Sequence, residues 1–286
     1  MLRLTAEQHT RFKADGFVIV ENILHGETVA AAAERFAPLF RGEFETGAMP
    51  DEWNWREGRD SDHLTRQICN GWKSDRVVAS IVLRADIGRA CAELMGWPGA
   101  RLNQDNVLWK PPGAAALGHH QDASYESWVV PREMATCWMT LDATSADGGT
   151  IEYVRGSHRW GLSPPISQFH APADHQVDMR RAAAVAGVEP DVVRIECAAG
   201  SGVLHHGRTW HGSAANRSNQ PRRSLVAHCM SSEARFHPTN VSAIYGRYKR
   251  PGELSMDESF FPILWTQKGR RTEFLEKYAV GLPQGP

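Results

Sequence analysis

Two residues near the middle of the chain, His120 and Asp122, lie two positions apart within Gly118-His119-His120-Gln121-Asp122. On an extended strand, side chains two positions apart point to the same face, so the imidazole and the carboxylate would lie side by side. Such a pair suits a divalent transition metal. Two His and one carboxylate, with coordination positions left open, form the ligand set of non-haem Fe(II) oxygenases. The pair therefore predicts a metal site if another segment supplies the second His.

A candidate for this second ligand is His211, in the block Thr209-Trp210-His211-Gly212-Ser213. His205 and His206 are close to it in sequence and compete for the role. His119 precedes the first ligand, but its side chain would point to the opposite face of the strand. The residues alone leave these alternatives open.

Arg222 and Arg223 follow the His211 block and are predicted to lie on a strand. A guanidinium is always charged and can bind a carboxylate with two parallel hydrogen bonds. A metal beside a fixed Arg fits a co-substrate that chelates at one end and carries a free carboxylate at the other, as 2-oxoglutarate does. Neighbouring side chains on a strand face opposite ways, so only one of the two arginines can reach such a ligand.

If His120 and Asp122 were an isolated pair, a simple hydrogen bond without a metal would be the better interpretation.

Many short segments around these residues have the composition or the alternation of strands. Within 135–143, Ala135, Cys137, Met139 and Leu141 would share one face, opposite to Thr136, Trp138 and Thr140. Asp147-Gly148-Gly149 is predicted to be a hairpin turn. The expected strands are residues 16–20, 103–110, 120–125, 135–143, 150–154, 192–197, 202–206 and 224–230. This pattern predicts a mainly β protein with a double-sheet jelly roll at its core.

Helices are expected before this core, from a capping box at Thr5 to Gln8, from about 25 to 40, and from about 74 to 95. We predict one domain over 1–286, with N-terminal helices at about 1–100, the jelly roll at about 101–232 and a C-terminal extension at about 233–286. Residues 41–63 are expected to form an irregular loop near the mouth of the site. Residues 162–190 are Pro-, His- and Ala-rich and are expected to form a lid.

The composition places limits on the function. The chain has 286 residues, 42% of them hydrophobic and 23% charged, with a formal net charge of −1. This balance gives no basic surplus for nucleic acid. No apolar run reaches membrane-spanning length, and the N-terminus lacks the apolar core of a signal peptide. Five scattered cysteines indicate reduced thiols, so we expect a cytoplasmic protein.

Taken together in their order and spacing, these motifs resemble those of the phytanoyl-CoA dioxygenase (PhyH-like) family of Fe(II)/2-oxoglutarate oxygenases. The last fifth of the chain matches the family pattern only loosely. The segments that carry the resemblance are Leu4–Gln8, Asp15–Val20, Trp109–Gly113, His120–Asp122, Gly148–His158 and the stretch from His211 to Arg222.

The resemblance implies a double-stranded β-helix (cupin-like) core and a ferrous ion held by His120, Asp122 and His211. It selects His211 because Arg222 follows at the family's spacing, and it implies that Arg222 binds the distal carboxylate of 2-oxoglutarate. Other implied contacts with this co-substrate come from Ser213, Trp138 and Asn106. At the Asn106 position, relatives have Met, and this sequence departs from them.

The implied activity is oxidation of a small molecule by O2, with 2-oxoglutarate converted to succinate and CO2. Hydroxylation is the expected outcome; desaturation, epoxidation and cyclisation are the alternatives. Halogenating relatives have Ala or Gly where this chain has Asp122, so the carboxylate favours oxygenation. Natural-product biosynthesis is one expected setting. Five aromatic residues could line a substrate pocket, although packing in the core is the more frequent role of such residues. They are Trp53, Trp55, Tyr125, Trp128 and Trp210.

Two other functional classes stay open. A metal-binding jelly roll without oxygenase activity, such as a sugar isomerase or a sensor, would explain the metal ligands but has no use for Arg222 or Ser213. A protein or nucleic-acid demethylase or hydroxylase is disfavoured by the neutral charge. The sequence therefore predicts a small-molecule partner and leaves the oligomeric state open.

Overall fold

A computed structural model of the chain describes residues 1–278. The helices are α1 (Ala6–Asp15), α2 (Gly26–Phe40), α3 (Arg76–Val82), α4 (Ala85–Met95), α5 (Val177–Ala186) and α6 (Leu275–Tyr278), with 3-10 turns η1 (Gly71–Lys73), η2 (Asp122–Tyr125), η3 (Ser157–Arg159) and η4 (Tyr245–Tyr248). The strands are β1 (Phe17–Val20), β2 (Glu52–Trp53), β3 (Arg66–Cys69), β4 (Gly99–Lys110), β5 (Leu117–His120), β6 (Val129–Val130), β7 (Ala135–Thr140), β8 (Ile151–Val154), β9 (Val192–Arg194), β10 (Gly202–His206), β11 (His211–Ser213), β12 (Arg222–Ser231), β13 (Arg235–Phe236) and β14 (Ile263–Thr266).

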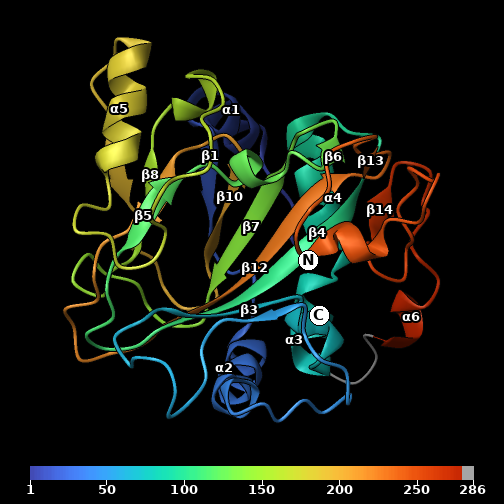
Figure 1. Cartoon of the computed structure of the whole chain (residues 1–286), viewed down its shortest axis with the longest axis horizontal. Helices are drawn as coiled ribbons and strands as arrows, with labels where there is room; N and C mark the ends of the chain where they lie inside the picture. The colour runs from blue at the N-terminus through green and yellow to red at the C-terminus, as the bar shows by residue number, and fades with distance from the viewer. Residues whose placement is uncertain (279–286) are drawn as a thin grey trace.

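Two antiparallel sheets form the centre of the molecule. The large sheet has the order β1-β10-β7-β12-β4-β3-β2, with β14 also paired to β4, and the small sheet has the order β5-β11-β8-β9. In Figure 1 the small sheet lies on one side of the large sheet, and α3 and α4 lie on the other side. This is the predicted jelly-roll class, a mainly β core with flanking helices.

The alternation along β7 explains why helices cover one face of the large sheet while the other face lines a cavity. Ala135, Cys137 and Met139 pack into the main hydrophobic core together with side chains of the helices. Thr136 and Trp138, on the opposite face, line the cavity between the sheets. Because successive side chains of a strand point to opposite faces, one six-residue strand serves both the core and the site. The prediction for this strand is confirmed.

One local prediction is incomplete and another is wrong. The segment 74–95 is helical, as predicted, but it is divided into α3 and α4, because the backbone of Arg84 is extended (φ −63°, ψ 135°). Apolar residues continue on both sides of this break, so periodicity could not reveal it. The turn at 147–149 does not join a hairpin, since β7 belongs to the large sheet and β8 to the small sheet.

The segments on either side of the jelly roll add strands to it. Of these, β1 was predicted, as the strand 16–20, whereas β3 and β14 were not. β1 pairs with β10, and β3 pairs with β4. β14, from the predicted C-terminal extension, also pairs with β4. The organisation into one domain stays a prediction. Among the described residues, every helix is too short or too polar to cross a bilayer.

Candidate metal centre and cavity

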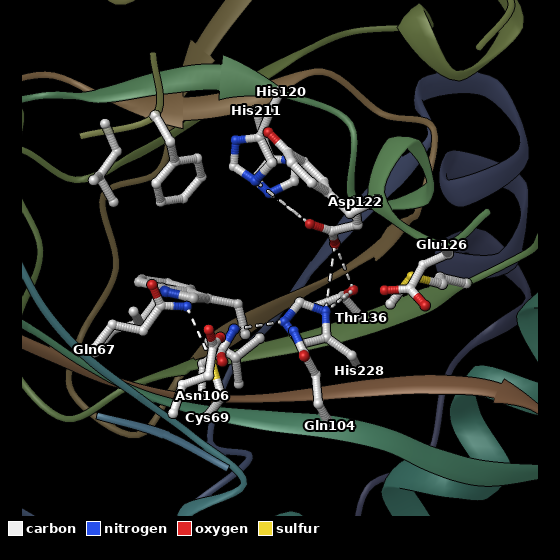
Figure 2. Close-up of a pocket in the computed structure, with 18 of the residues that line it drawn as sticks. Gln67, Cys69, Gln104, Asn106, His120, Asp122, Glu126, Thr136, His211 and His228 are labelled. Carbon is white, nitrogen blue, oxygen red and sulfur yellow. Dashed lines mark hydrogen bonds and ion pairs between the residues drawn. The ribbon is translucent and has the colours of Figure 1, made fainter. Parts of the chain in front are cut away.

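His120, Asp122 and His211 come together at one end of the small sheet. His120 ends β5 and His211 begins β11, and the two residues are direct cross-strand partners. The prediction that Asp122 continues the strand is wrong, because Asp122 begins the 3-10 turn η2. Its Oδ1 still lies 3.5 Å from Nε2 of His120 and 3.4 Å from Nε2 of His211. Figure 2 shows the three side chains at the rim of the cavity.

The protonation of the two imidazoles fits a metal site. Nδ1 of His120 donates to the carbonyl of Gly118 at 2.9 Å, and Nδ1 of His211 donates to the carbonyl of Thr209 at 3.0 Å. A carbonyl only accepts, so Nδ1 holds the hydrogen and a neutral ring presents a lone pair at Nε2. Burial and the neighbouring His120 hold the pKa of His211 well below its usual range. Two lone pairs and a carboxylate oxygen therefore face one another, an arrangement that a bound cation stabilises.

The second oxygen of Asp122 is held by residues behind the site. Oδ2 accepts hydrogen bonds from the hydroxyl of Thr136 at 2.8 Å and from Nε2 of His205 at 2.9 Å. Nδ1 of His205 must then accept from the hydroxyl of Tyr153, 2.9 Å away. His205 thus orients the carboxylate of Asp122 and does not take the place of His211 in this group, and Oδ1 of Asp122 remains directed at the two imidazoles.

Arg222 and Arg223 face opposite ways on β12, as the strand geometry predicts. Arg223 points away from the cavity and pairs with Asp142, with Nη2 2.7 Å from Oδ1. Arg222 lines the cavity and is only 4% exposed. It forms no ion pair within residues 1–278, and its buried Nε has no hydrogen-bond partner there. Burial lowers the pKa of Arg222 to about 10, so the guanidinium stays charged at neutral pH without a counter-ion. An unpaired buried cation is a binding site for an anion.

Ser213 lies on β11 and lines the same cavity. Its Oγ accepts a hydrogen bond from Nζ of Lys110 at 2.7 Å, and the same amine donates to the carbonyl of Ala214. Since the Ser213 oxygen accepts from Lys110, its own hydrogen is free to be donated to a carboxylate. Lys110 pairs with Arg222 across β4 and β12, and burial together with Arg222 lowers its pKa well below the usual value. The sequence analysis did not assign Lys110 a role.

Asn106 lines the cavity, but its amide is oriented by His228. The hydroxyl hydrogen of Thr136 goes to Asp122, so Nδ1 of His228, 2.9 Å from Thr136 Oγ1, is the donor in that contact. Nε2 of His228 then accepts from Nδ2 of Asn106 at 2.9 Å. Oδ1 of Asn106 is buried without a partner within residues 1–278. In this orientation Asn106 presents an accepting oxygen, which does not suit the implied contact with a carboxylate of the co-substrate.

The cavity between the sheets has a volume of about 280 Å³. Trp138 lines this cavity, and the centroid of its ring lies 5.9 Å from the guanidinium carbon of Arg222. Of the five aromatic residues considered for a substrate pocket, Tyr125 and Trp128 line the cavity and Trp53, Trp55 and Trp210 do not. Glu52, from the segment 41–63, also lines the cavity, so this part of the segment lies at the site as predicted. The segment is not irregular throughout, because Glu52 and Trp53 form β2.

The segment 162–190, predicted to be a lid, contains α5 and packs over β5. The ring of Phe169 lies 4.8 Å from that of His120, and Phe169 lines the cavity. The segment therefore covers the metal centre. Its opening and closing stay a prediction.

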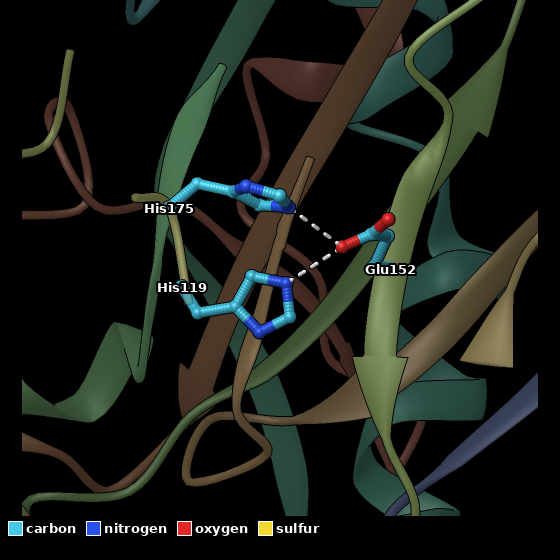
Figure 3. A group of neighbouring side chains, drawn as sticks. All are labelled: His119, Glu152 and His175. Carbon is cyan, nitrogen blue, oxygen red and sulfur yellow. Dashed lines mark hydrogen bonds and ion pairs between the residues drawn. The ribbon is translucent and has the colours of Figure 1, made fainter. Parts of the chain in front are cut away.

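A second His-carboxylate cluster lies on the outer side of β5. His119 points away from His120, as predicted, and its Nε2 lies 3.0 Å from Oε2 of Glu152. His175, from the lid segment, places its Nε2 3.0 Å from the same oxygen, and Figure 3 shows both rings directed at it. Gln176 and Arg194 also donate to this carboxylate. The nitrogens that face Glu152 therefore carry hydrogens, and the cluster fastens the lid segment to the sheet.

The buried carboxyl group of Glu126, in the cavity lining, should make the free energy of unfolding depend on pH. Burial raises the pKa of Glu126 to about 7. Between pH 4.5 and 7, roughly, the folded protein keeps a proton that the unfolded chain has released, so the free energy of unfolding falls as pH rises through this window. We expect Glu126→Gln to raise the free energy of unfolding at pH 8 by about 1–3 kcal/mol, with a much smaller effect at pH 4.5.

Urea unfolding of the metal-free protein and the variant at both pH values measures this difference. Other titrating groups cancel in the comparison between the two proteins. An equal loss of stability at both pH values would show that the Glu126 carboxylate is satisfied in the folded protein.

With this geometry in place, comparison with known proteins defines the family. Residues 12–224 match the family Phytanoyl-CoA dioxygenase (PhyH). The chain belongs to this family. A family relative, described as a probable alpha-ketoglutarate-dependent hypophosphite dioxygenase of Stutzerimonas stutzeri, is 24% identical over 254 residues, 85% of this chain and 84% of its own length. Alpha-ketoglutarate is another name for 2-oxoglutarate.

Solved structures agree with the fold of this PhyH chain. The non-haem alpha-ketoglutarate-dependent carbocyclase SnoK from nogalamycin biosynthesis has a TM-score of 0.69 and 21% identity, covering 91% of this chain and 96% of its own. The epimerase SnoN, solved with Fe3+, alpha-ketoglutarate and nogalamycin RO, has a TM-score of 0.66 and 21% identity, covering 90% of this chain and 97% of its own. The predicted family and fold class are confirmed.

Proposed function

We propose that this protein is an Fe(II)- and 2-oxoglutarate-dependent dioxygenase that oxidises a small organic molecule, and that hydroxylation is its reaction. The observation that carries this proposal is the convergence of two imidazole lone pairs and one carboxylate oxygen beside a cavity that also holds an unpaired guanidinium. Family membership and the alpha-ketoglutarate-dependent relatives support the same chemistry.

The role of each residue follows from its contacts. His120, Asp122 and His211 would hold the ferrous ion, which, with 2-oxoglutarate and O2, would supply the oxidation and release succinate and CO2. Arg222 would bind the distal carboxylate of 2-oxoglutarate with charge-assisted hydrogen bonds, and Ser213 would donate its free hydroxyl hydrogen to it. Trp138 would pack against the co-substrate.

Three further residues would position this machinery. Thr136 and His205 fix the carboxylate of Asp122, and Lys110 fixes the hydroxyl of Ser213. Because ligand orientation decides metal affinity, loss of such a partner weakens a metal site about 10–100-fold in other proteins. Phe169 and the lid segment would exclude water from the His120 side of the cavity.

Hydroxylation is preferred over halogenation because Asp122 occupies the carboxylate position of the ligand set. The solved neighbours include a carbocyclase and an epimerase, so other outcomes of the same oxidation are part of the test. A metal-binding isomerase or sensor would leave the Arg222 guanidinium without a ligand. A cytoplasmic location remains a prediction.

A succinate-release screen over a metabolite library under 18O2 tests the proposal. The expected result is a substrate-dependent burst of succinate together with a product heavier by one 18O atom. A product that has lost two hydrogens and gained no oxygen would replace hydroxylation with desaturation or cyclisation. Chlorinated product with chloride present, or iron-loaded enzyme without any 2-oxoglutarate consumption, would contradict the proposal.

A further inference from the structure

Glu126 is a buried carboxylate that the proposed chemistry does not use. It lies four residues after Asp122 and lines the same cavity. The side chain is only 5% exposed, and its Oε2 has no hydrogen-bond partner within residues 1–278. Figure 2 shows its carboxylate turned toward the cavity between Asp122 and His228. Asn103 is the one side chain that acts on Glu126 through a hydrogen bond, and Oε2 stays unsatisfied. A buried carboxylate oxygen without a partner is costly to the fold, and a ligand that satisfies it recovers that cost.

Within the part of the chain that the structure describes, no basic side chain is paired with this carboxylate. Within residues 1–278, Glu126 forms no ion pair, and Arg132 is the one basic residue whose charge acts appreciably on it. The guanidinium of Arg132 is already committed, because Nε donates to the carbonyl of Ala123 at 2.7 Å and Nη2 donates to that of Ser124. The charge of Glu126 therefore remains directed into the cavity.

The two ends of the cavity carry opposite charges. Along β12, Arg222 and His228 both line the cavity and are six residues apart, which on a strand corresponds to about 20 Å. Glu126 lies beside the His228 end in Figure 2. Arg222 is the sole Lys or Arg among the described lining residues, whereas Glu52 is a further carboxylate in that lining. The end away from Arg222 therefore favours a cation and disfavours an anion.

Aromatic rings surround the same end. Trp128 and Tyr245 line the cavity, and their ring centroids lie 5.3 Å apart. The hydroxyl of Tyr245 donates to Oε1 of Gln104, the cross-strand partner of His228, which places these rings at the Glu126 end. Aromatic faces attract cations, so these rings also favour a positively charged group at this end of the cavity.

We propose that the substrate carries a basic nitrogen and that the carboxylate of Glu126 binds this nitrogen, as the specificity-determining contact of the cavity. The inference rests on the proposed function, because it names the substrate class of the same site. 2-Oxoglutarate would occupy the Arg222 end of the cavity. The substrate would be held at the opposite end through its nitrogen, so that its remaining part would lie next to the metal ligands.

The test is anaerobic titration calorimetry of the protein loaded with Fe(II) and 2-oxoglutarate at pH 8. The probes are two isosteric sets: benzylamine, benzyl alcohol and benzoate, and tryptamine, tryptophol and indole-3-acetate. In at least one set we expect the amine to bind at least about tenfold more tightly than the alcohol, with the carboxylate weakest, as a charge-assisted hydrogen bond requires. In Glu126→Gln the preference should disappear. Glu21→Gln, the same change at an exposed site outside the cavity, should keep it.

The proposal is overturned if the alcohol binds as tightly as the amine, if the preference survives in Glu126→Gln, or if no probe binds up to 10 mM, roughly the weakest affinity of interest. The ranking in the unmodified protein is informative even where the variant folds poorly. Formation of the Fe(II)–2-oxoglutarate complex is checked by its visible band before any probe is added. Failure at that step counts against the proposed function, and failure at the probe step counts against the assignment of Glu126.

Discussion

Replacing His211 with Ala is expected to abolish substrate-dependent succinate formation, with a loss of more than about 1,000-fold, because the metal centre supplies the reaction itself. Two protein donors would remain where three now lie within 4.8 Å of one another. Asp122→Ala should have the same effect, since it removes the oxygen that faces both imidazoles. Iron content after desalting measures the cause, and succinate release measures the consequence.

His206→Ala is the matched control. His206 is next to His205, but it lies outside the cavity lining, and its ring packs against those of Phe12 and His158. This variant should keep its iron and its turnover. If His211→Ala kept tight iron and coupled turnover while His205→Ala lost them, the ligand set would be misassigned and His205 would take the place of His211.

Arg222→Ala is expected to raise the KM for 2-oxoglutarate by about 100-fold, equivalent to about 3 kcal/mol, because charge-assisted hydrogen bonds to a carboxylate are lost in a buried site. The kcat at saturating 2-oxoglutarate should fall much less, since Arg222 is proposed to hold the end of the co-substrate away from the metal. Steady-state kinetics with varied 2-oxoglutarate measures this separation.

Arg223→Ala is the control for Arg222→Ala, because Arg223 is the neighbouring residue on β12 and faces away from the cavity. It removes the pair with Asp142, which is partly exposed, so stability should fall by about 0–1 kcal/mol while the KM for 2-oxoglutarate stays unchanged. A raised KM in Arg223→Ala together with an unchanged KM in Arg222→Ala would reverse the assignment.

The chemistry-bearing residues were predictable because strands impose simple rules. Alternation predicted that Arg222 and Arg223 face opposite ways and that Trp138 lies opposite Cys137, and it separated His119 from His120. The resemblance, and not alternation, selected Arg222 and Trp138 for the cavity. The convergence of His211 with His120 required more than alternation. It depends on β5 pairing with β11 in one register, which the resemblance implied and the residues alone left open.

The remaining features depend on packing between distant segments. Asp122 reaches the imidazoles from a 3-10 turn, where the period-two argument no longer holds, so its position beside them was predicted from an incorrect local conformation. His228 meets Asn106 only when β4 and β12 pair, and Lys110 meets Ser213 only when the two sheets come together. Oε2 of Glu126 is notable for having no hydrogen-bond partner within residues 1–278, and a missing partner has no signature in a single sequence. The quoted Trp109–Gly113 motif was the available signal for Lys110.

The most direct test of the central claim is anaerobic titration of the metal-free protein with Fe(II) in the presence of 2-oxoglutarate. Three protein donors beside an unpaired guanidinium predict one ferrous ion per chain and a weak visible charge-transfer band that appears only when both components are present. In His211→Ala the band should be absent. One bound ion with no such band at saturating 2-oxoglutarate, or a band that persists without His211, would contradict this account of the site.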